Sequence, residues 1–132
     1  MLEAPEEFYY TPRHMWVRLH TEEGTAEVGI TEPFAEELPE ILSVDMPMLG
    51  DELEMDTECM HLHLETGLEP LFAPLTGRIT GVNEDVEDDP DLLHVAPMTN
   101  WIFRMEYDEE EELEMLLSSK RYMTYLDHLD AD

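Results

Sequence analysis

Short segments of alternating polar and apolar residues, separated by glycine or proline, constrain the fold of this 132-residue chain more than any other feature. Successive side chains of a strand point to opposite faces, so alternation with a period of two predicts strands with one buried face. The clearest case is the segment 59–65, where three apolar side chains would face the core and four others the opposite side: Met60, Leu62 and Leu64 against Cys59, His61, His63 and Glu65.

Similar β-prone segments predict a mainly β chain. They occur at 8–11, 15–20, 25–30, 41–46, 71–75, 78–83 and 101–105, and turns are predicted at Thr66-Gly67 and Thr76-Gly77. Only two helices are expected, a short one near 32–38 and a C-terminal one near 109–126, and the acidic segment 84–91 is expected to be an exposed loop. This pattern favours one domain over 1–132, an antiparallel barrel or sandwich.

The charge balance excludes two classes of partner. The chain has 34 Asp and Glu against 6 Lys and Arg, a formal net charge of -28. Nucleic acids and anionic membrane surfaces are bound through clustered basic side chains, so neither is an expected partner. No apolar run is long enough to span a bilayer, the acidic segment 1–7 does not resemble a signal peptide, and Cys59 is the single cysteine. We therefore expect a cytoplasmic protein without an internal disulfide.

Seven segments in the same order resemble the H protein of the glycine cleavage system. The similarity covers nearly the whole chain, although Met15 stands where that family usually has glutamate. The matching segments are Tyr10-Thr11, His14–Val17, Val28–Glu32, Val44–Gly50, Ala73–Ile79, Trp101–Phe103, and Leu113–Leu117 with Tyr122. The resemblance implies a barrel-sandwich hybrid of the lipoyl-domain type, made of two antiparallel sheets with a helix at the C-terminal end.

The resemblance also implies a lipoate carrier, in which one lysine at a hairpin tip holds the cofactor in amide linkage. Counting back without a gap from Ala73-Pro74 places Thr66 at the position of that lysine, and the single lysine of the chain, Lys120, falls in the predicted C-terminal helix. Threonine has neither the amine nor the long stem that the swinging cofactor needs. We therefore expect no lipoate on this chain, and a docking or regulatory homologue of the carrier without catalytic activity of its own.

The resemblance suggests three kinds of partner: aminomethyltransferase, glycine decarboxylase-like proteins, and lipoate-handling enzymes. Alternatively, the chain is one of several paralogues, and a lysine-bearing sibling performs the glycine chemistry.

A different interpretation rests on the polar face of the segment 59–65. Its side chains would lie about 6–7 Å from their nearest neighbours along one strand face. Two histidines at this spacing can bind one divalent metal ion, with Cys59 or Glu65 as a third ligand. The predicted metal ligands are Cys59, His61 and His63. Cys59 and His61 also form a Cys–His pair in sequence, but side chains that are parallel on a strand do not converge for nucleophilic catalysis.

Overall fold

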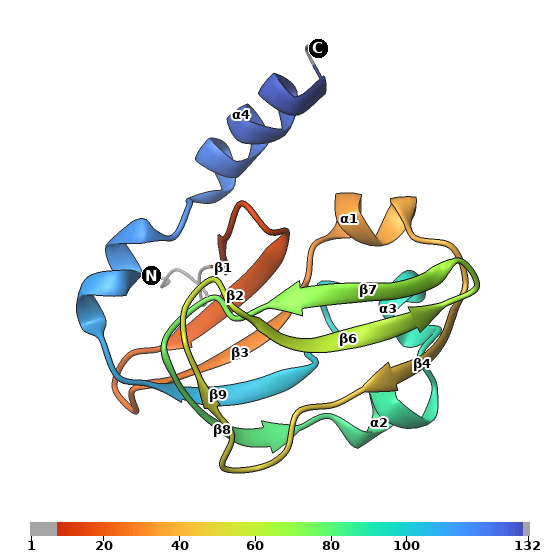
Figure 1. Ribbon diagram of the computed structural model, residues 1–132. Helices are drawn as coiled ribbons and strands as arrows, with labels where there is room; N and C mark the ends of the chain where they lie inside the picture. The colour runs from red at the N-terminus through yellow and green to blue at the C-terminus, as the bar shows by residue number, and fades with distance from the viewer. Residues whose placement is uncertain (1–7, 131–132) are drawn as a thin grey trace.

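The computed structural model describes residues 8–130, which form two antiparallel sheets with helices at their margins (Figure 1). Residues 1–7 and 131–132, including the acidic N-terminal segment, lie outside the described part. The larger sheet has six strands in the order β1 (Phe8–Tyr10), β2 (Met15–His20), β3 (Thr25–Ile30), β9 (Phe103–Tyr107), β8 (Gly77–Val82) and β5 (Glu52–Leu53). The smaller sheet has the order β4 (Ile41–Asp45), β6 (Glu58–Leu64) and β7 (Gly67–Phe72). The expected mainly β fold with two antiparallel sheets is confirmed.

One hydrophobic core joins the two sheets. Leu62 from the small sheet and Val28, Ile79 and Met105 from the large one are all fully or almost fully buried in the same cluster. Along β6, Met60, Leu62 and Leu64 are buried, whereas His61 and His63 are half-buried on the other face, as the alternation predicts. Burial of one face therefore fixes which side of β6 presents the histidines.

A close contact between β2 and β3 fixes the position of Trp16. Trp16 lies directly opposite Gly29, and its buried indole Nε1–H donates a hydrogen bond to the carbonyl oxygen of Pro97 at 2.9 Å. A Cβ atom at position 29 would lie 2.6 Å from three atoms of the indole ring, so only glycine allows the ring to cross here.

A buried carboxylate on β3 links the two neighbouring strands of the large sheet through ion pairs. Glu27 on β3 is 7% exposed and forms ion pairs with Arg18 on β2 and Arg104 on β9. Burial raises the pKa of Glu27, but the hydrogen bonds and charges of the two guanidinium groups outweigh it and leave the pKa below its ordinary value. The carboxylate is thus ionised and paired in the fold.

The predicted short helix near 32–38 is confirmed as α1 (Glu32–Glu37). The expected acidic loop is wrong in part, because residues 84–88 form a helix, α2 (Glu84–Asp88), followed by α3 (Leu92–Val95). The Asn83 side chain accepts a hydrogen bond from the Asp85 amide, and Val86 is fully buried, so a cap and one apolar anchor hold this acidic turn. No helix in the described part of the chain combines the length and apolar character needed to cross a membrane.

The C-terminal helix expected near 109–126 is also wrong in its extent. A 3-10 helix over Glu110–Met115 and an α-helix, α4 (Ser119–Asp130), replace it. Between them Leu117 is extended and exchanges two backbone hydrogen bonds with Tyr10 on β1, at 2.7 and 2.8 Å. This pairing interrupts the apolar periodicity that predicted one continuous helix. The first turns of α4 are anchored through Tyr122, whose ring stacks on Tyr10, and the rest of α4 extends away from the sheets (Figure 1).

Candidate functional site

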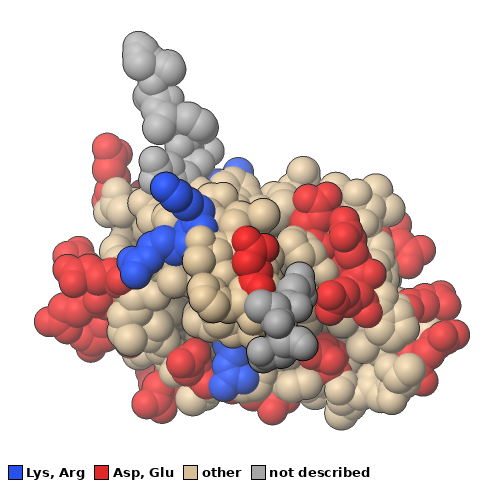
Figure 2. All heavy atoms as spheres, turned by 90° about the horizontal axis from the view of Figure 1, so that it is seen from above, with Lys and Arg blue, Asp and Glu red and all other residues tan. Residues whose placement is uncertain are grey.

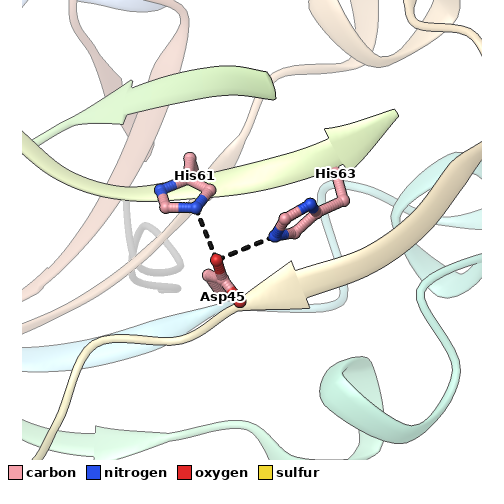
Figure 3. Close-up of side chains that lie close together, drawn as sticks. All are labelled: Asp45, His61 and His63. Carbon is pink, nitrogen blue, oxygen red and sulfur yellow. Dashed lines mark hydrogen bonds and ion pairs between the residues drawn. The ribbon is translucent and has the colours of Figure 1, made fainter. Parts of the chain in front are cut away.

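Two histidines of β6 and one aspartate of β4 meet on the outer face of the small sheet. His61 and His63 are two residues apart on β6 and therefore share one face. Asp45 on β4 lies directly opposite His61 in the antiparallel register, and Ser43 lies opposite His63. Strand pairing thus places one carboxylate between two imidazoles, and Figure 3 shows both rings turned toward it.

Both imidazole rings point to the same oxygen atom of Asp45. Asp45 Oδ2 lies 2.5 Å from His61 Nε2 and 2.8 Å from His63 Nε2. The Nε2 atoms and the carboxylate oxygen all lie within 4.8 Å of one another. The side chains are 51%, 30% and 41% exposed for Asp45, His61 and His63, so the cluster is open to solvent on one side.

The local charges favour an ionised aspartate. The hydrogen bond with His63 is the largest effect and lowers the pKa of Asp45; desolvation opposes it, and the electrostatic interactions with His63 and His61 and the hydrogen bond with His61 lower the pKa further. The other ring nitrogen of His61, Nδ1, lies 3.8 Å from Glu58 Oε2. Acidic side chains also surround the molecule more widely: in Figure 2 they spread over the visible face, whereas Lys and Arg form a few small patches.

Cys59 is not brought into this cluster. Its thiol is half-buried against the core and points to the carbonyl oxygen of Leu71, with Sγ at 3.6 Å. Burial, aided by the charge of Glu58, raises the pKa of the Cys59 thiol to about 12, so the group is a neutral thiol at physiological pH. Glu65, the other suggested third ligand, lies in the turn after β6 and is also absent from the group of ligand atoms that meet in the described residues.

The structure thus brings together two of the three predicted ligands, His61 and His63, and places Asp45 beside them in place of Cys59. Asp45 was missed because its place beside the histidines depends on the pairing of β4 with β6. The sequence signal for it was present but weak: a carboxylate in a segment correctly predicted as a strand.

The hairpin tip lies at the end of the same strand. Glu65 and Thr66 form the exposed two-residue turn between β6 and β7, and Gly67 follows with a φ of 134°, a conformation that residues with a Cβ atom rarely adopt. The turn therefore offers a carboxylate and a hydroxyl, and no amine. Lys120 lies near the start of α4, and Figure 1 shows this helix well apart from the turn between β6 and β7.

The family model for the glycine cleavage H-protein matches residues 8–129, which is almost the entire chain. The chain belongs to the glycine cleavage H-protein family. H proteins are lipoate carriers and not catalysts, which agrees with the expectation that this chain is not an enzyme.

Individual H proteins show the same relationship over their full length. The glycine cleavage system H protein of a Psychrobacter species is 35% identical over 127 residues, covering 96% of this chain and 100% of the relative. The H protein of Pectobacterium atrosepticum is 34% identical over 128 residues, covering 96% and 98%. The crystal structure of the H protein from Mycobacterium marinum superimposes with a TM-score of 0.76 at 26% identity, covering 90% of this chain and 95% of that one. The H-protein scaffold is therefore retained from β1 to α4.

Proposed function

We propose that this chain is an H-family docking protein that binds the partners of a lipoyl carrier but does not itself carry lipoate. The observation that carries this proposal is the hairpin turn, where Glu65 and Thr66 are the two turn residues and no lysine is present. Counting back without a gap from Ala73-Pro74, we assign Thr66 to the position of the lipoyl lysine. A hydroxyl cannot form the amide that holds lipoate, and its short stem cannot reach between active sites.

The retained scaffold supports a binding role. The family match extends across both sheets and α4. The fold that supports the partner-binding surface of the relatives is therefore present outside the hairpin turn. We propose the aminomethyltransferase and the decarboxylase of glycine cleavage as partners, with lipoate-handling enzymes as the next class, and a cytoplasmic location. Such a protein would compete with the loaded carrier and so regulate it.

The absence of lipoate is tested by intact mass. The full chain is co-expressed with a lipoate ligase and supplied with lipoate, with a lipoylated H protein as the positive control. The expected result is an unmodified mass for this chain. A gain of one lipoyl group would contradict the proposal, and its persistence or loss in Lys120→Arg would locate the modified residue.

Thr66→Lys is a matched variant for the same experiment, because it returns an amine to the exposed turn without touching the core. We expect this variant alone to gain a lipoyl group. This outcome would show that the missing amine, and not the altered surroundings of the turn, prevents modification.

The docking role is tested by competition. Purified chain is added to an aminomethyltransferase assay that runs on a lipoylated H protein. We expect inhibition that is relieved by more lipoylated carrier. Undiminished activity at a large excess of this chain, together with no measurable complex, would contradict docking on that enzyme.

A further inference from the structure

From the cluster on the outer face of the small sheet, we infer that Asp45, His61 and His63 bind one divalent transition-metal ion of the zinc type. This inference goes beyond the docking function and does not depend on it. The donor set of two imidazole nitrogens and one carboxylate oxygen suits zinc, cobalt, nickel or ferrous iron. Calcium and magnesium ions prefer donor sets made only of oxygen atoms, so we do not expect either ion at this site.

The separations of the donor atoms are close to those of a bound site. Zinc lies about 2.0–2.2 Å from nitrogen and oxygen ligands, so neighbouring donors of a tetrahedral site are about 3.3–3.5 Å apart. The two contacts to Asp45 Oδ2 are 2.5 and 2.8 Å. Each must therefore open by less than about 1 Å to admit an ion, which small rotations of exposed side chains provide. The two rings, with centroids 5.3 Å apart, already converge on the same atom.

The backbone beneath the donors is held in place. Val44 and Leu62, the neighbours of Asp45 and of the histidines, pair across the two strands and are buried on the core face. Each donor is therefore set by a paired strand and not by a loop, which lowers the cost of assembling the site.

The surroundings complete the arrangement. Glu58 Oε2 lies 3.8 Å from His61 Nδ1, the ring nitrogen turned away from Asp45. This distance is too long for a hydrogen bond, but a side-chain rotation that closes it would let the carboxylate orient the metal-binding imidazole and make it a stronger donor. Among the described residues, Asp45 has no arginine or lysine as an ion-pair partner, so no fixed cation of the chain occupies the site. The net charge of -28 further raises the local concentration of cations.

Three protein donors leave at least one coordination position open toward solvent. Once the ion is bound, water would fill that position, because the donor side chains are 30% to 51% exposed.

The test is metal titration of the untagged full chain after removal of metal with a chelator. Zn²⁺ is added at about physiological ionic strength with excess Mg²⁺, which occupies non-specific carboxylate sites, and Co²⁺ serves as the spectroscopic probe. We expect one equivalent of tightly bound Zn²⁺. The Co²⁺ form should show visible absorption bands that indicate nitrogen ligands. Binding that Mg²⁺ abolishes, or the absence of a saturable first equivalent, would overturn the inference.

Variants locate the ion. Asp45→Asn, His61→Gln and His63→Gln should each lower the Zn²⁺ affinity by at least about tenfold, and Glu58→Gln by about tenfold. His128→Gln on α4 is the matched control and should leave the affinity unchanged. Zn²⁺ affinities of Asp45→Asn, His61→Gln and His63→Gln that equal the affinity of the native chain would overturn the inference.

Folding of the variants does not limit the test, because the native chain provides an independent readout. The imidazole resonances of His61 and His63 should shift on addition of one equivalent of Zn²⁺, while those of His128 stay in place. Unchanged resonances at positions 61 and 63 would overturn the inference as well.

Discussion

The substitution Gly29→Ala tests the packing on which the larger sheet depends. The new methyl group would lie 2.6 Å from Cε2, Cζ2 and Nε1 of Trp16, whereas ordinary contacts between such atoms begin near 3.4 Å. The indole must therefore withdraw by about 0.8 Å or more to restore ordinary contact. The indole is 1% exposed, so it can withdraw only by displacing its neighbours in the core.

The cost can be worked from these contacts. Displacing a well-packed core side chain costs about 1–3 kcal/mol. Withdrawal of the ring also lengthens the 2.9 Å hydrogen bond from Nε1 to the Pro97 carbonyl oxygen, and an unsatisfied buried donor costs about 1–3 kcal/mol. Replacing glycine by alanine in a strand returns about 0.5–1 kcal/mol. Together these contributions predict that the free energy of unfolding falls by about 1–5 kcal/mol.

Gly81→Ala is the matched control. Gly81 also lies within a strand, β8, but a Cβ atom there would have its nearest neighbours at 3.7 and 3.9 Å, which is ordinary contact. Alanine at this position should leave stability unchanged or raise it by up to about 1 kcal/mol. Urea unfolding of both variants, followed by circular dichroism, gives the two free energies, and the slopes should match that of the native chain. Equal midpoints for Gly29→Ala and the native chain, or an equal loss in Gly81→Ala, would refute the reasoning.

Three further predictions concern side chains outside the histidine cluster. Because the pKa of Glu27 is lowered in the folded chain, its ion pairs stabilise the fold fully above its ordinary pKa of about 4.3, and this contribution disappears as the pH falls through the lower folded value. The stability difference between the native chain and Glu27→Gln, measured by urea unfolding, should therefore shrink between about pH 6 and pH 3; a difference that grows would contradict the assignment. The Cys59 thiol, with its pKa raised to about 12, should react with iodoacetamide at pH 8 at least about tenfold more slowly in the folded chain than in urea, and equal rates would show that the thiol is accessible. The Glu112 carboxylate accepts hydrogen bonds from both the amide and the hydroxyl of Thr76 at 2.7 Å. Glu112→Ala should therefore lower the free energy of unfolding, measured by thermal or urea titration, by about 1–3 kcal/mol. The matched variant Glu111→Ala, at an exposed position, should change it by less than about 0.5 kcal/mol.

The acidic C-terminal region shows where local patterns were insufficient. The spacing of Leu113, Leu116 and Leu117 is compatible with one amphipathic helix, and it predicted one. In the structure Leu116 packs into the core while Leu117 pairs with Tyr10 at the edge of the large sheet. An available strand edge more than 100 residues earlier in the chain decided this conformation, and no local periodicity contains that information.

The hairpin and its neighbours illustrate the opposite case. Strict alternation over β6 identified the strand, its core face and the shared face of His61 and His63. The same alternation also placed Cys59 on that face, but a register shift between Glu58 and Met60 lies at its end of β6, and the thiol turns to Leu71. A bulge of this kind re-aims a side chain without altering the polar and apolar pattern.

The sequence by itself determined the class of the fold, the membership suggested by the ordered motifs, the identity of the residue at the hairpin turn, and the two histidines that share a face. These features depend on residue order, on the period of two in strands, and on which amine groups the chain contains. Only the tertiary structure decided that Asp45 completes the cluster, that Cys59 does not, and that the C-terminal helix divides at Leu117. Each of these depends on which strands pair and in which register, and that choice is made by burial of the whole core.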